Sequence, residues 1–575
     1  MNASSDASGA QQRRTLDRWL PLALIQPLLL GAVLRLWKLP GQILAGDELH
    51  GVRAALADPI PVLLTTYRTA DPCLPLSAFY RWLMDRGWSL SELDLRLPVV
   101  VASLLAVVLL PMLVRREVGR GSALAFGWLL AVAPPLVVYG RMARPYGIVV
   151  LLAGVAVLSF YRWWRPGGDR RWIFGAVYAV TAPLAVYFHL PAAPFVAAPF
   201  VFALGDGLHS GELRQRWRGL VAVGAGALAG IAAFALPARE SLAAVVAAKQ
   251  GASQWSAEIL GPVAQLLAAT DSTLVTALFW IGVATGLVWS CLRNPRFAAY
   301  TATLVAIHLL VLWWSAPFGA FSPLIVARYL LVILPLLLIW LAVALAELAQ
   351  LLAIGAGKGL PWPLAQRAAW TAVAVVMAGW LLQGPMGWPE WRKSNFLMHD
   401  DLLRFHQPPG HRPEARQAEV GPTRSILPEA YRRLVDQGSL LEYPFRPAWR
   451  FARAPYLYQR EHGRWVRVAM LDPGLCDERL SFTNAVCPRP EEILASPSRY
   501  LIVHLDLRAE EDAVAGRRAR RDVRRPGRWQ VYAAAARRLA ENLEQRWGRP
   551  TVAEEGILIW NLDDVRARRG RSTID

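Results

Sequence analysis

The chain has 575 residues, of which 55 % are hydrophobic and 18 % are charged, and its formal net charge is +19 at pH 7. The apolar residues are concentrated in long runs before about residue 384, which excludes an ordinary soluble enzyme. The positive charge does not indicate a nucleic-acid-binding protein, because most of the early Arg residues lie in short segments between apolar runs, where they set membrane topology.

Eleven apolar runs are long enough to cross a bilayer as helices, since about 20 such residues span its hydrocarbon core. The predicted spans are 19–37, 97–114, 121–139, 146–161, 172–189, 191–206, 220–237, 273–291, 298–314, 329–354 and 368–384. A cleaved signal peptide is the alternative for the first run, but no small-x-small pattern follows it. The expected fold is therefore mainly α, a polytopic membrane protein with a C-terminal α/β domain.

The distribution of Lys and Arg predicts the orientation of the spans. If the N-terminus is cytoplasmic, the inner segments taken together hold these residues at more than twice the density of the outer loops. An odd number of spans then places the C-terminal part outside. We expect a transmembrane domain at 1–384, with its first outer loop at 39–96, and a periplasmic domain at 385–575. The expected location is a bacterial inner membrane.

The first outer loop carries three carboxylates near the membrane surface. Asp47 and Glu48 are adjacent, where a lone charge beside a low-dielectric layer is costly. Alternatively, the pair caps the N-terminus of a helix. Asp71 begins the stretch Asp71–Pro72–Cys73–Leu74–Pro75–Leu76. Three carboxylates in one loop leave a divalent cation open, although the sequence predicts no fixed metal site or cofactor.

Three Arg residues lie at predicted outer ends of spans, a placement that the distribution of basic residues disfavours. Arg141 and Arg144 share the tight hairpin between the third and fourth spans, and Arg328 lies at the start of the tenth. A guanidinium group matches the oxygen atoms of a phosphate in a fork, so an anionic phosphate ligand is one explanation. The alternative is that these side chains reach from the helix ends to the bilayer interface.

The C-terminal part mixes strand and helix patterns. Short apolar stretches predict strands at 439–443, 465–470, 500–505 and 556–562, and an Ala-, Leu- and Arg-rich stretch predicts a helix at 526–547. Cys476 and Cys487 form a disulfide if this part is outside the cytoplasm, or remain two free thiols. A run of Arg residues at 517–528 is either a solvated basic face or a surface for anionic lipid or glycan.

Taken in this order, these features resemble the membrane glycosyltransferases of the GT-C superfamily, above all the protein O-mannosyltransferase and aminoarabinose transferase group. The resemblance covers roughly residues 17–350. It is carried by Asp47–Glu48, the stretch 71–76, Arg96–Leu97–Pro98, the hairpin from Tyr139 to Tyr146, and Arg328–Tyr329 followed by Pro335.

The resemblance implies a polyprenyl-phosphate-linked sugar as donor, and the hydroxyl of a glycan, lipid or protein as acceptor. It implies inversion at the anomeric carbon. Asp47 is then the general base, Glu48 positions donor or acceptor, and Asp71 lines the same cavity. Arg141, Arg144 and Arg328 hold the donor phosphate. The candidate substrate-binding residues are His50, Tyr146, His189 and Tyr329.

One departure from the family pattern keeps two alternatives open. Cys73 stands where members of the group often have His or Lys, so one contact to the phosphate is lost. A catalytically silent membrane scaffold that binds glycan is the first alternative. A transporter of lipid-linked glycan is the second, although such proteins usually have internal repeats and charges near the middle of the bilayer.

Overall fold

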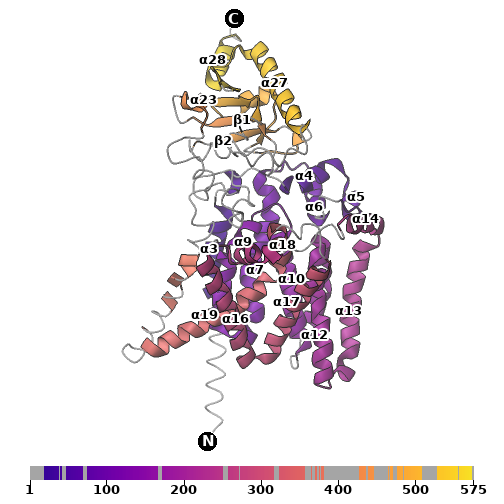
Figure 1. Cartoon of the computed structure of the whole chain (residues 1–575). Helices are drawn as coiled ribbons and strands as arrows, with labels where there is room; N and C mark the ends of the chain where they lie inside the picture. Colours follow the sequence, from indigo (N-terminus) through magenta and orange to yellow (C-terminus); the bar gives the residue numbers. More distant parts are fainter. Residues whose placement is uncertain are drawn as a thin grey trace. The chain divides into compact units, whose positions relative to one another are not determined.

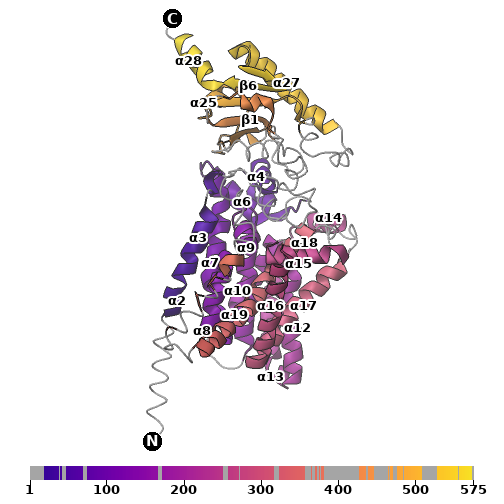
Figure 2. The same cartoon turned by 60° about the vertical axis from the view of Figure 1, so that its left-hand side comes forward.

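The fold is described from a computed structural model of the chain (Figures 1 and 2). The described residues are 19–37, 39–41, 44, 47–68, 74–165, 171–249, 257–270, 272–315, 323–356, 364, 370–371, 374–375, 377–380, 427–434, 438–445, 464, 466–470, 475–482, 485–507, 510, 527–554 and 556–572. Asp71, Cys73 and most of the Arg run at 517–528 lie outside these ranges.

The chain divides into two compact units, which are described separately. The first unit consists of Met1–Trp37, Asp58–Phe79 and Arg96–Gly387. The second consists of Lys38–Ala57, Tyr80–Leu95 and Trp388–Asp575. Two stretches of the loop that the sequence predicts to be the first outer one thus belong to the same unit as the C-terminal domain.

The first unit is helical, and its longer helices make this chain a multi-pass membrane protein. Seven described helices are long and apolar enough to cross a membrane, and three shorter apolar helices lie at 20–36, 120–132 and 172–188. Ten predicted spans therefore coincide with apolar helices, whereas the run at 368–384 lies mostly outside the described residues.

The helices from the N-terminus to the middle of the unit are α2 (Trp19–Ala23), α3 (Ile25–Leu36), α5 (Ile60–Thr65), α7 (Glu92–Val118), α8 (Arg120–Val132), α9 (Pro134–Tyr139), α10 (Tyr146–Trp164), α11 (Arg171–Phe188) and α12 (Ala193–His209). The remaining ones are α13 (Leu213–Ala235), α14 (Arg239–Lys249), α15 (Leu260–Ala268), α16 (Thr273–Arg293), α17 (Pro295–Ser315), α18 (Pro323–Tyr329) and α19 (Leu334–Ala356).

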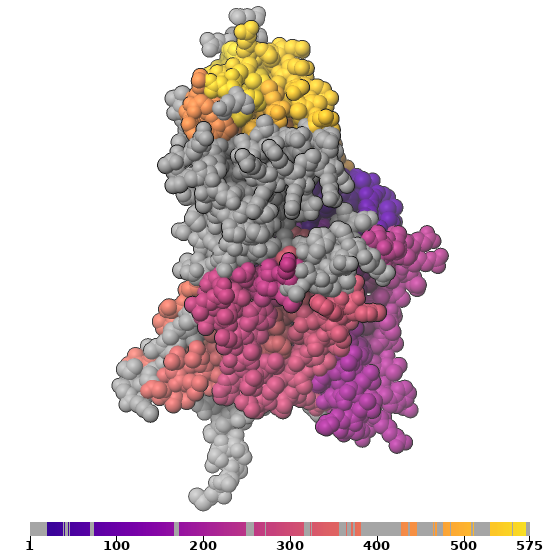
Figure 3. Space-filling model, viewed as in Figure 1, coloured from indigo at the N-terminus to yellow at the C-terminus, as the bar shows by residue number. Residues whose placement is uncertain are grey.

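Small residues let these helices approach closely, whereas large apolar side chains cover their outer faces. A Cβ atom added to Gly286 of α16 would lie 1.7 Å from the carbonyl oxygen of Trp340 in α19, so only glycine fits this crossing. Outward-facing Leu228 on α13 and Leu274 on α16 are more than half exposed. Such side chains suit contact with lipid tails, and Figure 3 shows one face of this unit coloured by residue number.

The third predicted span, 121–139, is wrong as one continuous helix. It is broken into α8, which ends at Val132, and α9, which begins at Pro134. The residue before a proline avoids the α conformation, and Ala133 accordingly has φ −55° and ψ 114°. The break exposes carbonyl groups at the end of α8, and Arg35 of α3 donates to two of them.

The contacts of Arg35 explain how a fully buried guanidinium group is tolerated in the membrane unit. It donates to the carbonyl oxygens of Leu130 and Ala131 at 3.0 and 2.8 Å, and to the Ser103 hydroxyl at 2.8 Å. A positive charge at the C-terminal end of a helix also complements the helix dipole. Arg35 therefore joins α3, α7 and α8.

The second unit contains a six-stranded sheet in the order β3-β2-β1-β4-β6-β5. The four strands β1, β2, β3 and β4 are parallel, and β6 and β5 are antiparallel to their neighbours. The strands are β1 (Leu440–Phe445), β2 (Val466–Met470), β3 (Ala485–Val486), β4 (Tyr500–His504), β5 (Val552–Glu554) and β6 (Ile557–Asn561). The helices are α4 (Glu48–Ala57), α23 (Glu429–Arg432), α25 (Pro490–Ala495), α27 (Gly527–Trp547) and α28 (Leu562–Ser572). Two helices, α6 (Leu74–Asp85) and α7, have residues in both units.

The two faces of the sheet have separate cores. On one face, Leu441 and Leu501 pack with Ala536 and Leu543 of α27, and on the other face Leu440 and Ile502 pack with α23. The four predicted strands and the helix at 526–547 are confirmed. The short strands β3 and β5 were not predicted, because strands this short have no clear alternating pattern.

A buried ionic cluster lies where β1 meets β4. The Nδ1 atom of His504 is 2.9 Å from both carboxylate oxygens of Glu510, and its Nε2 atom is 3.7 Å from Glu442. The Tyr431 hydroxyl donates to Glu442 at 3.1 Å. Burial lowers the pKa of His504, but the charges of Glu510 and Glu442 and hydrogen bonds to both outweigh it and raise this pKa to about 10.

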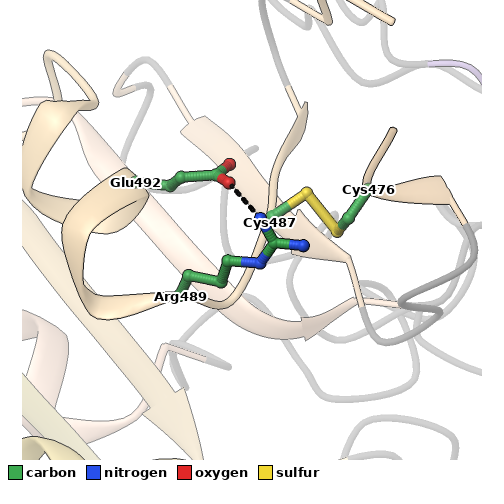
Figure 4. The surroundings of a disulfide bond; sticks show 4 residues. All are labelled: Cys476, Cys487, Arg489 and Glu492. Carbon is green, nitrogen blue, oxygen red and sulfur yellow. Dashed lines mark hydrogen bonds and ion pairs between the residues drawn. A yellow bond between two sulfur atoms is a disulfide. The ribbon is translucent and has the colours of Figure 1, made fainter. Parts of the chain in front are cut away.

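The structure joins Cys476 to Cys487 through a disulfide bond, with their Cα atoms 5.6 Å apart (Figure 4). Just beyond Cys487, Arg489 donates to Glu492 at 3.3 Å, at the start of α25. The bond closes a loop between β2 and α25 that contains the edge strand β3.

Candidate functional site

Five side chains of the first unit meet at the ends of its helices. The Nε atom of Arg328 donates to the Tyr139 hydroxyl at 3.3 Å, and its guanidinium carbon lies 5.9 Å from the centre of that ring. The Tyr139 and Tyr146 rings pack edge to face, with their centres 5.0 Å apart. The centre of the His189 ring lies 5.7 Å from that of Tyr146 and 6.2 Å from that of Tyr329. We call these residues the Arg328 cluster.

Each member of the Arg328 cluster lies where a helix begins or ends. Tyr139 ends α9 and Tyr146 begins α10, so the turn between these helices brings the two rings together. His189 follows the last residue of α11, before a 3₁₀ turn at Leu190–Ala192. Arg328 and Tyr329 end α18. Four separate parts of the sequence therefore supply one group of side chains.

The cluster combines a positive charge with aromatic and imidazole groups. A cation within about 6 Å of a tyrosine ring is attracted to its face, which orients the Arg328 guanidinium. Tyr139, Tyr146 and His189 are each less than 9 % exposed, whereas Arg328 and Tyr329 are partly exposed. The arrangement suits an anion with an apolar or sugar portion beside it, because the rings supply flat surface and the guanidinium supplies charge.

Of the two hairpin arginines, Arg141 is used as a helix cap. Its Nη1 and Nη2 atoms donate to the carbonyl oxygens of Leu34 and Trp37 at 3.0 and 2.6 Å, at the C-terminal end of α3. Arg144 is also buried, at 7 % exposure, in the turn that precedes α10. Two of the four residues quoted from this hairpin, Tyr139 and Tyr146, are cluster members.

The predicted carboxylates Asp47 and Glu48 belong to the second unit. Asp47 immediately precedes α4, and its carboxylate lies 3.9 Å from Nε2 of His50. Glu48 is the first residue of α4 and is fully buried. An acidic residue in the first turn interacts favourably with the helix dipole and so stabilises the helix. This capping role is compatible with a chemical role for the same carboxylates. Asp71 lies outside the described residues.

Sequence reasoning gave no site role to Tyr139, a member of the cluster, or to His308, a neighbour of it. The Tyr139 hydroxyl orients Arg328, and Nε2 of His308 in α17 lies 3.1 Å from the carbonyl oxygen of Tyr329. The proximity of Tyr139 to two other quoted residues was visible in the sequence, whereas nothing local distinguishes His308. A small cavity lined by Tyr139, Tyr146 and Arg35 adjoins the cluster and has room for about one water molecule.

The described residues include no group of three or more His, Cys, Asp or Glu side chains placed to hold a metal ion. Among them, Arg328 and Arg144 carry guanidinium groups, the residue type that binds anions, and Asp47 carries a carboxylate, the residue type that accepts protons.

Comparison with known proteins supports the resemblance that the sequence showed. Residues 75–236 match the family model of dolichyl-phosphate-mannose-protein mannosyltransferase. This segment is less than a third of the chain, and the match confirms the family resemblance over it. The segment contains Tyr139, Arg144, Tyr146 and His189. No curated protein matches the chain.

Two solved structures are similar over most of their length. One is ArnT from Cupriavidus metallidurans bound to undecaprenyl phosphate, at 15 % identity and a TM-score of 0.45, covering 83 % of this chain and 94 % of ArnT. The other is the oligosaccharyltransferase of Archaeoglobus fulgidus, tethered to an acceptor peptide, at 11 % identity and a TM-score of 0.42, covering 90 % of this chain and 72 % of that protein. Structural similarity at these identities and TM-scores does not establish the activity of this chain.

Proposed function

We propose that this chain is a glycosyltransferase that moves a sugar from a polyprenyl-phosphate carrier to an acceptor hydroxyl, on the outer face of a bacterial inner membrane. The observation that carries the proposal is the meeting of Arg328 with Tyr139, Tyr146, His189 and Tyr329, three of which lie in the segment that matches the mannosyltransferase family. A multi-pass helical unit also offers lipid-facing surfaces for the carrier.

In the proposed reaction, the acceptor oxygen bonds to the anomeric carbon as the bond from that carbon to the phosphate oxygen breaks. The acceptor proton passes to the carboxylate of Asp47, and the electron pair of the broken bond leaves with polyprenyl phosphate. Attack from the side opposite the phosphate inverts the anomeric carbon. Glu48 positions the substrates, and the energy comes from the donor itself.

Arg144 and Arg328 would stabilise the charge that develops on the departing phosphate. Tyr146, His189 and Tyr329 would bind the sugar and the adjacent part of the carrier. We leave Arg141 out of the phosphate site, since both of its Nη atoms donate to the end of α3. Asp71 would line the same cavity, and His50 stays a candidate substrate-binding residue.

The test uses the full chain in lipid nanodiscs with a panel of polyprenyl-phosphate sugars, and measures release of polyprenyl phosphate by mass spectrometry. Asp47→Asn is compared with Glu541→Gln, a matched carboxylate-to-amide change at an exposed position of α27. We expect the parent and Glu541→Gln to turn over one donor, and Asp47→Asn to bind this donor with at least 10²-fold slower turnover.

Two results would contradict the proposal. If a donor binds equally to the parent and to Asp47→Asn and neither releases polyprenyl phosphate, the silent scaffold or the transporter explains the chain better. If Asp47→Asn turns over as fast as the parent, Asp47 is not the base.

A further inference from the structure

The loop closed by the disulfide forms a one-residue parallel bridge with the first outer loop. The Leu90 N–H donates to the carbonyl oxygen of Arg479, and the Ser481 N–H donates to the carbonyl oxygen of Leu90, both at 2.9 Å. The Ser89 hydroxyl adds a bond to the carbonyl oxygen of Glu478 at 3.3 Å, across 389 positions of sequence. All of these residues belong to the second unit.

The C-terminal side of this bridge is held rigidly. The disulfide between Cys476 and Cys487 closes the loop around it. Inside the loop, Asp477 accepts from the backbone N–H, Nε and Nη2 of Arg479, each at 2.9 Å. The hydrogen bond to the Arg479 side chain holds the pKa of Asp477 below its usual range, so the pair stays charged near neutral pH.

On the other side of the bridge, Leu90 follows α6 after a short turn. Two backbone bonds end this helix, from Gly87 to Met84 at 3.0 Å and from Trp88 to Leu83 at 3.1 Å. This is the pattern of a helix ended by a left-handed residue, and Gly87 has φ +81°. The turn at Gly87 therefore aims the chain at Leu90, which is fully buried.

From α6 the contacts reach the helix that begins at the predicted carboxylates. Arg81 of α6 donates to Asp85 at 2.7 Å and to the carbonyl oxygen of Ala55 at 3.4 Å. Ala55 lies in α4, whose first residue is Glu48, next to Asp47. An unbroken series of contacts thus runs from the disulfide loop through Leu90 and α6 to α4.

We propose that the disulfide-closed loop between Cys476 and Cys487 is a positioning element for Asp47 and Glu48, acting through Leu90, α6 and α4. This proposal rests on the proposed function, because it assigns the C-terminal domain a part in the same transfer reaction. No residue of the loop needs to touch the substrates. A small displacement of α4 is enough, since misplacing a catalytic group by about 1 Å can cost on the order of 10²-fold in rate.

The decisive variant is Ser481→Pro, which removes the N–H that donates to Leu90, and its matched control is Ser481→Ala, which keeps it. Hydrogen exchange is measured on the amides of α4, with α27 as the internal standard for folding. We expect Ser481→Pro to speed exchange in α4 by on the order of 5- to 10-fold, as the loss of about one backbone hydrogen bond predicts, and Ser481→Ala to match the parent.

The kinetic readout separates positioning from binding. We expect Ser481→Pro to lower kcat by about tenfold and to leave KM for the donor within about twofold. If exchange in α27 rises as well, the proline has unfolded the domain. The pair Cys476→Ser with Cys487→Ser then becomes the decisive variant, because it loosens the loop and keeps the N–H of Ser481.

Equal exchange of the α4 amides in Ser481→Pro and Ser481→Ala, with α27 unchanged, would overturn the proposal. So would an unchanged kcat in a variant whose α4 amides exchange faster. If α4 exchange rises as expected but the parent turns over no donor, the contact pathway stands and the proposed function fails, so the two failures are distinguishable.

Discussion

Arg328 and Tyr139 are 189 positions apart in the sequence and joined by one hydrogen bond of 3.3 Å from Nε to the phenol oxygen. The same guanidinium group lies over the Tyr139 ring. The ring and its hydroxyl together fix the direction of the guanidinium plane, and they tie the end of α18 to the end of α9. A charge whose orientation is set in advance suits the stabilisation of a departing phosphate, because it need not reorganise during the reaction.

Replacing Arg328 by alanine should lower kcat/KM for the donor by about 10²- to 10³-fold, the usual cost of removing a group that stabilises charge in the transition state. Arg328→Lys should recover only part of this loss, since lysine supplies the charge without the fork. The measurement is release of polyprenyl phosphate in nanodiscs. The control is Arg432→Ala, because Arg432 is exposed on α23. Equal rates for the alanine and parent proteins would remove Arg328 from the phosphate site.

Replacing Arg141 by methionine should destabilise the chain and spare its chemistry. The change leaves the carbonyl oxygens of Leu34 and Trp37 without their charged donor, which costs about 2–4 kcal/mol in total for buried groups. We expect a lower thermal midpoint in detergent and a donor Kd within about threefold of the parent. A large loss of donor affinity at unchanged stability would return Arg141 to the phosphate site.

Replacing both Cys476 and Cys487 by serine should lower the stability of the C-terminal domain by about 2–4 kcal/mol, the usual range for a disulfide. The cysteines are 11 positions apart, so the loop is short and the lower part of that range is expected. Pulse proteolysis in urea, with the surviving domain quantified on gels, measures this. An unchanged urea midpoint would show that the contacts of Asp477 and Leu90 hold the loop unaided.

Stability of the same domain should fall as the pH rises from 7 to 9. The folded-state pKa of His504 is raised to about 10, above the value near 6.5 of an unfolded histidine, so its stabilisation is complete below about 6.5 and is lost toward 10. Burial also raises the pKa of Glu442, whose contribution is lost as the pH rises above the usual carboxylate range. Urea midpoints at several pH values measure this.

The comparison variant for the pH experiment is His504→Gln, which keeps a polar side chain and cannot titrate. Its stability should be lower at pH 7 and should change less with pH than that of the parent. If the two proteins lose stability in parallel as the pH rises, His504 is not the group responsible.

Local patterns were sufficient to predict most of the helices and strands. Runs of about 20 apolar residues and short apolar stretches between turns depend only on nearby residues, so the spans and the four longer strands were predictable. The break between α8 and α9 was missed because the apolar run continues through Pro134 and Pro135, and only the backbone conformation distinguishes one helix from two.

The candidate site was less predictable, because its members come from four places in the sequence. Tyr146, His189, Arg328 and Tyr329 were selected from their positions at helix ends and from the family resemblance, and the structure groups them. No pattern in the sequence distinguishes Arg141, which caps a helix, from its neighbour Arg144. The distinction depends on where the end of α3 lies in three dimensions, and only the structure supplies that.

The hydrogen bonds of Arg35 bear on how the protein is made. Arg35 lies in α3, but the carbonyl groups that it needs, on Leu130 and Ala131, are 95 and 96 positions later in the chain. An arginine at the centre of a membrane-spanning helix costs on the order of 3 kcal/mol on insertion scales, and less near a helix end, where Arg35 lies. During translation, the hydrogen bonds that hold α3 in its final place therefore form only after α8 has been synthesised, so this part of the bundle is completed late.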